Sequence, residues 1–434
     1  YPVALTLSGT AIIVGLIGYL LDIFPLVLLS VLPNRIFGIL TNETLIAVPL
    51  FIFMGVMLEK SGISNQLLEN MSRIWGEKRG GLVYSILIVG VLMAASTGIV
   101  GATVVTMGIL SLPLMIKWKY NKKISTGIIC ASGTLGQIIP PSIVLVLLAD
   151  IFQGANEQAS AISGDLAPDP VSSVDLFAGA IFPGLFLVGL YALWIFICSK
   201  INPDVFPINK EIKKSNLNFL EILYVIMPPI ILIFIVLGSI LFGIATPTES
   251  ASLGALGSII ISLKKKVDFK IIEDVCYETL KISSMVFFIL IGASLFSLVF
   301  RGFGGDLIVE SFISALPGGA VSSFIVIMII IFFLGFFLDF FQIVFVIVPI
   351  VGPSLIALGY DPTWLALMFA INLQTSFLTP PFGFALFYLR GVSPKEIKTS
   401  DIYQGVIPFI FLQIILLVIL FKFPSIITWL PSKL

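Results

Sequence analysis

The sequence predicts an all-α polytopic membrane protein, built as an inverted repeat with two re-entrant hairpins and two broken helices. Three observations lead to this fold class. First, 58% of the 434 residues are hydrophobic and only 11% are charged, and apolar runs repeatedly reach the roughly 18 residues that mark a membrane helix. Second, Pro-Pro pairs at 140–141 and 380–381 interrupt two long apolar segments. Third, Lys and Arg gather on alternate connections, as they do on cytoplasmic loops.

The composition excludes several classes of function. The 24 basic residues balance the 24 acidic residues, so nothing indicates nucleic-acid binding. The chain has no histidine, which removes the commonest metal ligand and general base. The three cysteines, Cys130, Cys198 and Cys276, are far apart and form no CxxC pair. They are therefore interpreted as structural thiols in or beside apolar segments.

The first repeat begins with a membrane helix within residues 3–32, a short connection from Pro33, and a second apolar segment at 44–59. In 63–75, apolar residues recur at helical spacing among polar ones. This pattern predicts an amphipathic helix along the membrane surface. Its apolar residues are Ile63, Leu67, Leu68, Met71 and Trp75.

Residues 82–116 are apolar and have basic residues at both ends, so both ends are expected on the cytoplasmic side. The basic residues are Arg73, Lys78 and Arg79 before the segment, and Lys117, Lys119, Lys122 and Lys123 after it. Two full crossings would also return the chain to the cytoplasm. However, arms of about 14–18 residues are short of the roughly 20 needed to span. The sequence therefore favours a re-entrant hairpin with its tip near 96–98.

The next segment, 124–150, contains Pro140-Pro141. Two adjacent prolines remove two amide donors and clash with the preceding turn. In hydrocarbon, freed backbone groups are tolerated only where protein or a polar cavity re-satisfies them. The segment is therefore predicted to be a helix broken at membrane depth. Residues 151–175 carry several carboxylates but no Lys or Arg, which predicts an external loop.

The rest of the chain repeats this order. Helices are expected at 176–199, 222–243, 250–263 and 279–300, followed by a hairpin at 321–358, a broken segment at 363–389 and a last helix at 403–423. The second hairpin is predicted to open outward, because no Lys or Arg lies between Arg301 and Arg390. This topology places 19 of the 24 basic residues on the cytoplasmic side. The 5 exceptions (24 − 19) are Arg35, Lys60, Arg301, Lys422 and Lys433.

The two halves correspond in sequence as well as in order. Pro140 and Pro380 are 240 positions apart (380 − 140), and Asn42-Glu43-Thr44-Leu45 and Tyr277-Glu278-Thr279-Leu280 are 235 apart (277 − 42). One hairpin opens inward and the other outward, so the repeat is inverted. Because helix 222–243 has no counterpart, a further helix is expected before residue 1. Matched breaks in two halves are the best sequence indication of a transporter's binding site.

Each break frees backbone carbonyls and places hydroxyls nearby, a chemistry that suits a small hard cation. Half-helix N-termini on the other side of each break favour an anion. The first predicted cation site comprises Ser96, Thr97, Gly98, Ser132, Gly133, Thr134 and Gly136, and the second comprises Gly335, Asp339, Asn372, Gln374, Thr375, Ser376 and Thr379. The predicted substrate-contacting residues are Arg301, Pro140, Pro141, Pro380 and Pro381.

Each of these residues has a structural alternative. A membrane Ser or Thr often bonds its own i−4 carbonyl or a neighbouring helix. A carboxylate within an apolar run is a functional hypothesis by default, so Asp339 is predicted to bind or gate an ion; its alternative is a helix cap at the hairpin tip. Arg301 either meets a substrate carboxylate or snorkels to the interface.

Several stretches resemble the large membrane subunit (DctM-like) of tripartite ATP-independent periplasmic (TRAP) transporters, over essentially the whole chain. The matching stretches are 46–55 (IAVPLFIFMG), 133–136 (GTLG) with 139–142 (IPPS), 245–251 (ATPTESA), 338–339 (LD), and 372–375 (NLQT) with 378–381 (LTPP). The family's first hairpin tip often reads Ser-Gly-Ser-Ser, whereas here it reads Ser96-Thr97-Gly98.

The resemblance implies a sodium-driven elevator-type secondary transporter of the bacterial inner membrane, not an enzyme. It implies sodium as the coupling ion, with one site between each hairpin tip and the following broken helix, and no organic cofactor. It also implies a small four-helix membrane subunit and a soluble periplasmic substrate-binding protein as partners.

The sequence therefore predicts sodium-coupled uptake of an organic acid anion. Residues 82–150 and 321–390 would form the moving core, and residues 1–81, 151–320 and 391–434 the scaffold against the small subunit. Two alternatives remain. One is a sodium/carboxylate symporter that needs no receptor. The other is an intramembrane lipid-modifying enzyme, against which the lack of histidine and of an acid–base or metal cluster argues.

Overall fold

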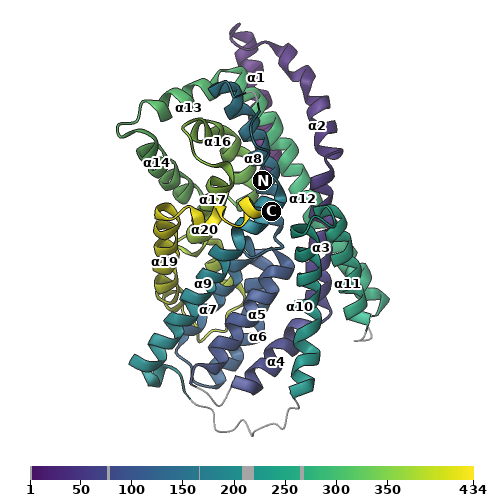
Figure 1. The fold of residues 1–434 in the computed structure, drawn as a ribbon, viewed down its shortest axis with the longest axis vertical. Coiled ribbons are helices and arrows are strands. Elements are labelled where there is room, and N and C mark those ends of the chain that lie inside the picture. Colours follow the sequence, from purple (N-terminus) through teal and green to yellow (C-terminus); the bar gives the residue numbers. More distant parts are fainter. Residues whose placement is uncertain (1, 76–78, 166, 208–218, 264–267) are drawn as a thin grey trace.

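The computed structural model describes residues 2–75, 79–165, 167–207, 219–263 and 268–434. These residues form a long bundle of helices (Figure 1). The first half contains α1 (Val3–Leu20), η1 (Leu26–Val31), α2 (Leu32–Leu40), α3 (Glu43–Lys60), α4 (Ile63–Trp75), α5 (Gly81–Thr97), α6 (Val100–Lys117), α7 (Lys122–Thr134), η2 (Leu135–Gln137), α8 (Ile143–Ser163), α9 (Ser173–Ile201) and η3 (Pro203–Val205). The second half contains α10 (Phe219–Leu241), α11 (Pro247–Leu263), α12 (Phe269–Gly302), α13 (Gly305–Ser314), α14 (Gly319–Leu334), α15 (Phe340–Gln342), η4 (Ile343–Ile347), α16 (Val348–Ala357), α17 (Pro362–Leu378), α18 (Phe384–Val392), α19 (Thr399–Lys422), α20 (Ser425–Thr428) and η5 (Pro431–Lys433).

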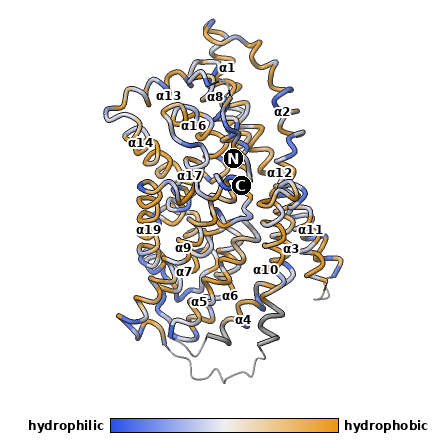
Figure 2. Tube along the Cα trace, viewed as in Figure 1, coloured by the Kyte–Doolittle hydropathy of each residue, from blue (hydrophilic) through white to orange (hydrophobic). Residues whose placement is uncertain are grey.

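The helices include enough long apolar segments for a multi-pass membrane protein. Within the described ranges, 6 helices are long and apolar enough to cross a membrane, and the bent pair formed by 26–40 and α3 would make 7. Hydrophobic residues predominate along most of the helices (Figure 2). Leu20 on α1 and Phe234 on α10 are 79% and 71% exposed. Such surfaces are stable in lipid and would be unusual in water.

Helices of the two halves pack in matched pairs. α3 runs along α11, and α1 runs along α12 in the same way (Figure 1). Both pairs approach closely at a glycine: a Cβ added at Gly254 would lie 2.6 Å from the sulfur of Met54, and one at Gly292 would lie 2.6 Å from the carbonyl oxygen of Ala4. Likewise α6 packs on α18, and α16 on α8. Each half therefore completes the other, as the predicted repeat requires.

Both predicted hairpins form. α5 and α6 join at Gly98, whose φ of 61° lies in the left-handed region that glycine favours. In the second half, residues 335–339 join α14 to the helical segment Phe340–Ala357. The first arms, α5 and α14, have 17 and 16 residues, and both second arms have 18. That the hairpins are re-entrant stays a prediction.

Both predicted helix breaks also form. α7 ends at Thr134 and α8 begins at Ile143, while α17 ends at Leu378 and α18 begins at Phe384. The Pro140–Pro141 and Pro380–Pro381 peptide bonds are both cis. The two breaks differ in exposure, because the first proline pair is buried and Pro381 is exposed.

Two connections predicted from the sequence are helical instead. The prediction of an external loop at 151–175 was wrong over the first half of this range, because α8 continues to Ser163. Phe152, Ala155 and Ala159 recur at helical spacing and are buried, on a helix that packs on α16. Only residues 164–172 connect α8 to α9. The short connection from Pro33 lies in α2, where proline occupies the first turn that it tolerates.

The predicted amphipathic helix is α4. Its apolar residues Ile63, Leu67, Leu68 and Met71 are buried, and α4 packs on α5.

Several basic residues used to predict the membrane topology lie outside the described part of the chain, and so do some side chains. They are Lys78, Lys210, Lys213, Lys214, Lys264, Lys265 and Lys266, and the side chains of Arg73 and Trp75.

Candidate functional site

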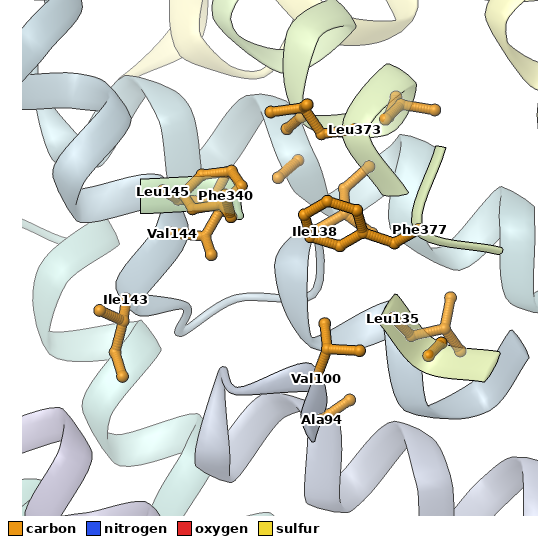
Figure 3. Packing of buried hydrophobic residues seen from close by; sticks show 14 of the residues in the cluster. Ala94, Val100, Leu135, Ile138, Ile143, Val144, Leu145, Phe340, Leu373 and Phe377 are labelled. Carbon is orange, nitrogen blue, oxygen red and sulfur yellow. The ribbon is translucent and has the colours of Figure 1, made fainter. Parts of the chain in front are cut away.

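The two hairpin tips and the two helix breaks meet around one cavity of about 120 Å³. Figure 3 shows this region, with Val100 from the first tip, Val144 beyond the first break, Phe340 from the second tip and Phe377 before the second break. The described lining residues are Gly98, Ile99, Val100, Gly101, Gln137, Val144, Met285, Asp339, Phe340, Phe341, Phe377, Phe384 and Tyr388. Segments up to 290 positions apart (388 − 98) therefore form a single chamber inside the bundle.

At the first predicted cation site, the broken segment lies against the hairpin. The break packs against both arms of the hairpin: a Cβ added at Gly136 would lie 3.2 Å from the carbonyl oxygen of Ala94, and one at Gly133 would lie 3.3 Å from Cα of Val104. At the tip, a Cβ added at Gly98 would lie 3.2 Å from the backbone nitrogen of Ile143. Glycine at these positions is what lets backbone approach backbone.

The hydroxyls of the first site donate to local carbonyls. Ser96 Oγ donates to Met93 at 2.9 Å, Ser132 Oγ to Ile129 at 3.2 Å, and Thr134 Oγ1 to Ala131 at 2.9 Å. Such bonds satisfy the hydroxyl proton and leave oxygen lone pairs for a cation. For Thr97 the structure describes only the backbone, at the end of α5.

The second predicted site is joined by bonds between α17 and α14. Asn372 Nδ2 donates to the carbonyl of Met328 at 2.8 Å, and Ser376 Oγ donates to Phe332 at 2.9 Å. Ser376 also packs directly on Gly335 at the tip. Thr375 and Thr379 instead donate to the carbonyls four residues before them, at 2.9 and 2.8 Å. These bonds hold the broken helix against the hairpin, as in the first half.

Gln374 lies apart from this group and links the two halves. Its Nε2 donates to Thr134 Oγ1 at 3.3 Å, and the two residues are 240 positions apart (374 − 134). They therefore occupy equal places in the two repeats. Gln374 Oε1 is buried and has no hydrogen-bond partner among the described residues, and such a group is a costly feature to retain without a role.

Asp339 lies at the second tip and lines the cavity. It also caps the helix that begins there: Oδ1 accepts from the backbone nitrogen of Phe341 at 3.0 Å, and the side chain of Gln342 accepts from the nitrogen of Asp339 at 3.3 Å. The capping alternative raised by the sequence is therefore present. It does not conflict with ion binding, because a carboxylate has about four acceptor positions.

The predicted substrate residues do not line this cavity in the described structure. Arg301 lies 16 residues beyond the cavity residue Met285 on α12, about 24 Å along a helix. Its guanidinium donates to Gln158 on α8, and to the carbonyl of Pro349 at 3.4 Å. The four prolines lie in the two breaks, between one half-helix and the next. The carbonyl of Pro381 accepts a hydrogen bond from the Tyr403 hydroxyl at 3.1 Å.

Sequence reasoning missed several cavity residues. Gln137 is 1% exposed, and its Oε1 has no hydrogen-bond partner among the described residues. Its place in the polar run before Pro140 was a usable signal. Met285 and Tyr388 carried no such signal. Tyr388 reaches the cavity because Gly101 leaves room for its ring, at a point where an added Cβ would lie 2.9 Å from Cζ.

Paired tips, paired breaks and a cavity between them define a membrane transport protein of the internal-repeat class. The family model for the tripartite ATP-independent periplasmic transporter DctM component matches residues 1–426, and the chain belongs to this family.

Similar proteins include the C4-dicarboxylate TRAP transporter large permease DctM of Vibrio cholerae. It is 28% identical, over 91% of this chain and 86% of that protein. A putative TRAP large permease of Haemophilus influenzae is 30% identical, over 94% and 96%. The 2,3-diketo-L-gulonate TRAP large permease YiaN of Escherichia coli is 25% identical, over 99% and 94%. The YdaH transporter structure of Alcanivorax borkumensis shares the fold, with a TM-score of 0.66 at 15% identity, over 97% of this chain and 98% of that chain.

Proposed function

We propose that this chain is the large permease of a sodium-coupled tripartite transporter that takes up an organic acid anion. The proposed setting is the bacterial inner membrane, with a small four-helix membrane subunit and a periplasmic substrate-binding protein as partners. The chamber between the tips and breaks carries the proposal, because residues of both pseudosymmetric halves line it. The reaction is transport without covalent chemistry.

The proposed sodium sites are the two groups of residues around the breaks. Their hydroxyls donate to carbonyls and keep lone pairs for an ion. Helix C-terminal ends at Thr134 and Leu378 add a negative dipole at the same places. Sodium binding would order each tip against its break and thereby complete the chamber for the anion.

The proposed movement is of elevator type, with residues 82–150 and 321–390 shifting against the rest. Two hydrogen bonds join this core to α3. Asn42 Nδ2 donates to Asp150 at 2.6 Å near one end of α3, and Thr106 Oγ1 donates to Glu59 at 2.6 Å near the other. Because these bonds cross the proposed boundary, a shift of the core would exchange them for other partners.

The proposed position of the small subunit is the face formed by α1 and α2. None of the residues of η1 or α2 is buried, although most are apolar. α2 lies at the upper right edge of the bundle in Figure 1. Lipid or a second membrane subunit would cover this surface.

Uptake by the complete transporter tests the function. The large and small subunits are reconstituted in liposomes with the neighbouring binding protein, loaded with its own radiolabelled ligand. An inward sodium gradient should drive accumulation, whereas an equal potassium gradient or omission of the binding protein should not. Accumulation that is equally fast in potassium would contradict sodium coupling, and uptake without the binding protein would favour the receptor-independent symporter.

A further inference from the structure

Two arginines outside the chamber lining lie on helices that pack on each other, Arg35 on α2 and Arg301 on α12. The half-buried residues of α2 recur at helical spacing and are Leu32, Arg35, Ile36 and Ile39. Arg35 therefore lies on the face of α2 that is turned toward the bundle. The positive charge of Arg301 is close enough to repel that of Arg35. Two like charges thus lie together at one edge of the bundle.

The end of α12 fixes the place of Arg301. A Cβ added at Gly302 would clash with the ring of Phe24 and would lie 2.9 Å from Leu28. Phe303 stacks on Phe24, with ring centroids 5.1 Å apart. The segment between α1 and α2 is therefore packed on this end of α12, and it holds Arg301 beside the start of α2.

The two guanidinium groups have few partners. In the part of the chain that the structure describes, the one ion pair joins Lys60 to Glu278, so neither arginine meets a carboxylate there. Arg301 uses only Nη2, which donates to Gln158 and to a backbone carbonyl. Its Nε and Nη1, and the whole guanidinium of Arg35, have no hydrogen-bond partner among these residues.

The acidic residues closest in sequence to Arg301 and Gln158 have other partners. Asp306, five positions after Arg301 (306 − 301), accepts from the backbone nitrogen of Leu307 at 3.0 Å. Glu157 accepts from Gln153 Nε2 at 2.9 Å. A charged group in apolar surroundings is costly unless an opposite charge accompanies it. The counter-ion of the two arginines is therefore expected from outside this chain.

The charge pattern of α12 places Arg301 at the depth of lipid headgroups. Lys281 and Arg301 bound a run of 19 residues (301 − 281 − 1) without a charged side chain. At 1.5 Å per residue this run is about 28 Å long, close to the roughly 30 Å of hydrocarbon in a bilayer. Phe37 and Leu40 follow Arg35 on α2 and are 67% and 59% exposed. Such side chains suit contact with acyl chains.

We infer that Arg35 and Arg301 bind the phosphate of a phospholipid whose acyl chains lie along the apolar residues of α2. A phosphodiester carries a negative charge, and its oxygens can accept from two guanidinium groups at once. The bilayer supplies phosphates at this depth without further positioning, which favours a lipid over a carboxylate of a neighbouring subunit. The inference goes beyond the proposed function, since it concerns neither the transported anion nor the coupling ion.

The test uses the purified complex of large and small subunits, delipidated in a neutral detergent and titrated under native mass spectrometry. The probes are dioleoyl phosphatidylglycerol, dioleoylglycerol and glycerol 3-phosphate. The second lacks the phosphate, and the third lacks the acyl chains. The phospholipid should bind at least ten times more tightly than either. Equal binding of dioleoylglycerol would indicate apolar contact alone, and equal binding of glycerol 3-phosphate would indicate a site for a free anion; either result would overturn the inference.

Variants assign the binding to the two arginines. Arg35→Gln and Arg301→Gln should each weaken the binding of phosphatidylglycerol about tenfold or more, because each removes a charge-assisted contact. Arg35→Lys keeps the charge without the planar fork and should give an intermediate affinity. The control is Lys422→Gln, which removes a basic side chain from α19, at the opposite edge of the bundle from α2 in Figure 1. It should leave the affinity unchanged.

A loss in the arginine variants no larger than that in the control would overturn the inference. Mass spectra also report the subunits, so release of the small subunit with unchanged lipid binding would assign the arginines to a carboxylate of that subunit and would overturn it too. Where the melting curve shows that a variant does not fold, the three probes on the wild type decide. Sodium-dependent uptake is not measured, so failure of the proposed function leaves this test intact.

Discussion

The two hairpin tips occupy equal places in the two repeats and differ in chemistry. At each tip a helix begins beside the shared chamber, at positions 240 residues apart (339 − 99), but one N-terminus follows Ile99 and the other follows Asp339. An internal repeat copies the path of the chain, because helix packing and glycine contacts depend on backbone geometry. It does not copy the charge of single positions, so each half is free to acquire its own role.

The largest effect on uptake is expected for a substitution that removes the Asp339 carboxylate, and with it the difference between the two tips. Asp339→Ala should lower sodium-dependent uptake by roughly 100-fold or more, because it removes both a proposed sodium ligand and a helix cap. Ile99→Ala, at the equal position, should lower uptake by only a few fold. The measurement is the initial uptake rate in liposomes, with the amount of folded complex checked by its melting curve. Similar losses in the two variants would break the proposed asymmetry.

A second pair of equal positions is Gly127 on α7 and Leu367 on α17 (367 − 127 = 240). A Cβ added at Gly127 would lie 2.6 Å from the carbonyl carbon of Gly405 on α19, whereas Leu367 packs through its side chain on Gly179 of α9. Gly127→Ala should therefore cost about 1–3 kcal/mol of stability, because backbone cannot yield as a side chain does. The control is Gly189→Ala on α9, where nothing lies within 4 Å. Thermal unfolding of the complex measures both, and equal melting temperatures would contradict the packing argument.

The smallest effect concerns a third pair, the helix caps Asn121 and Asp361 (361 − 121 = 240). Both cap a helix from the turn before it: Asn121 Oδ1 accepts from Lys123 at 2.9 Å, and Asp361 Oδ1 accepts from Trp364 at 2.6 Å. Burial, with a contribution from the charge of Asp175, raises the pKa of Asp361 above its ordinary value. Protonated Asp361 therefore stabilises the folded protein relative to the unfolded chain. This contribution is fully present below the usual Asp pKa of about 3.9 and is lost as the pH rises through the raised pKa of Asp361.

Asp361→Asn gives the second repeat the uncharged cap of the first. Relative to the wild type, its melting temperature should rise by about a degree as the pH increases from about 4 to about 7. Parallel melting curves for the two proteins over this range would show that Asp361 does not contribute to the pH dependence.

The sequence was sufficient to predict the features that occur in both repeats, namely the hairpins and the helix breaks. Apolar runs, basic ends and Pro-Pro pairs located both hairpins and both breaks, since each is a local signal with a direct cause in the backbone. The helical continuation of α8 to Ser163 was missed because several carboxylates suggested a loop. Its buried apolar residues at helical spacing were the better guide.

The chamber itself was only partly predictable. Asp339 and the polar residues around each break could be selected because polar groups in apolar runs are unusual. Met285, Phe384 and Tyr388 could not, because they belong to different helices and look like ordinary membrane residues. Arg301 was selected for its charge, but its distance along α12 and its bonds to Gln158 and Pro349 became visible only in three dimensions.

The contact between α7 and α19 has a consequence for where the moving body ends. Glycines 127 and 405 bring the two backbones together, and Trp364 Nε1 of α17 donates to the carbonyl of Leu420 at 3.1 Å. α19 is also held on its other side, because Gln413 Nε2 donates to the Tyr191 hydroxyl of α9 at 2.9 Å. The proposed shift of α7 and α17 against α9 would therefore break the contacts on one side of α19, and a fluorophore attached after α19 would report which neighbour the helix follows.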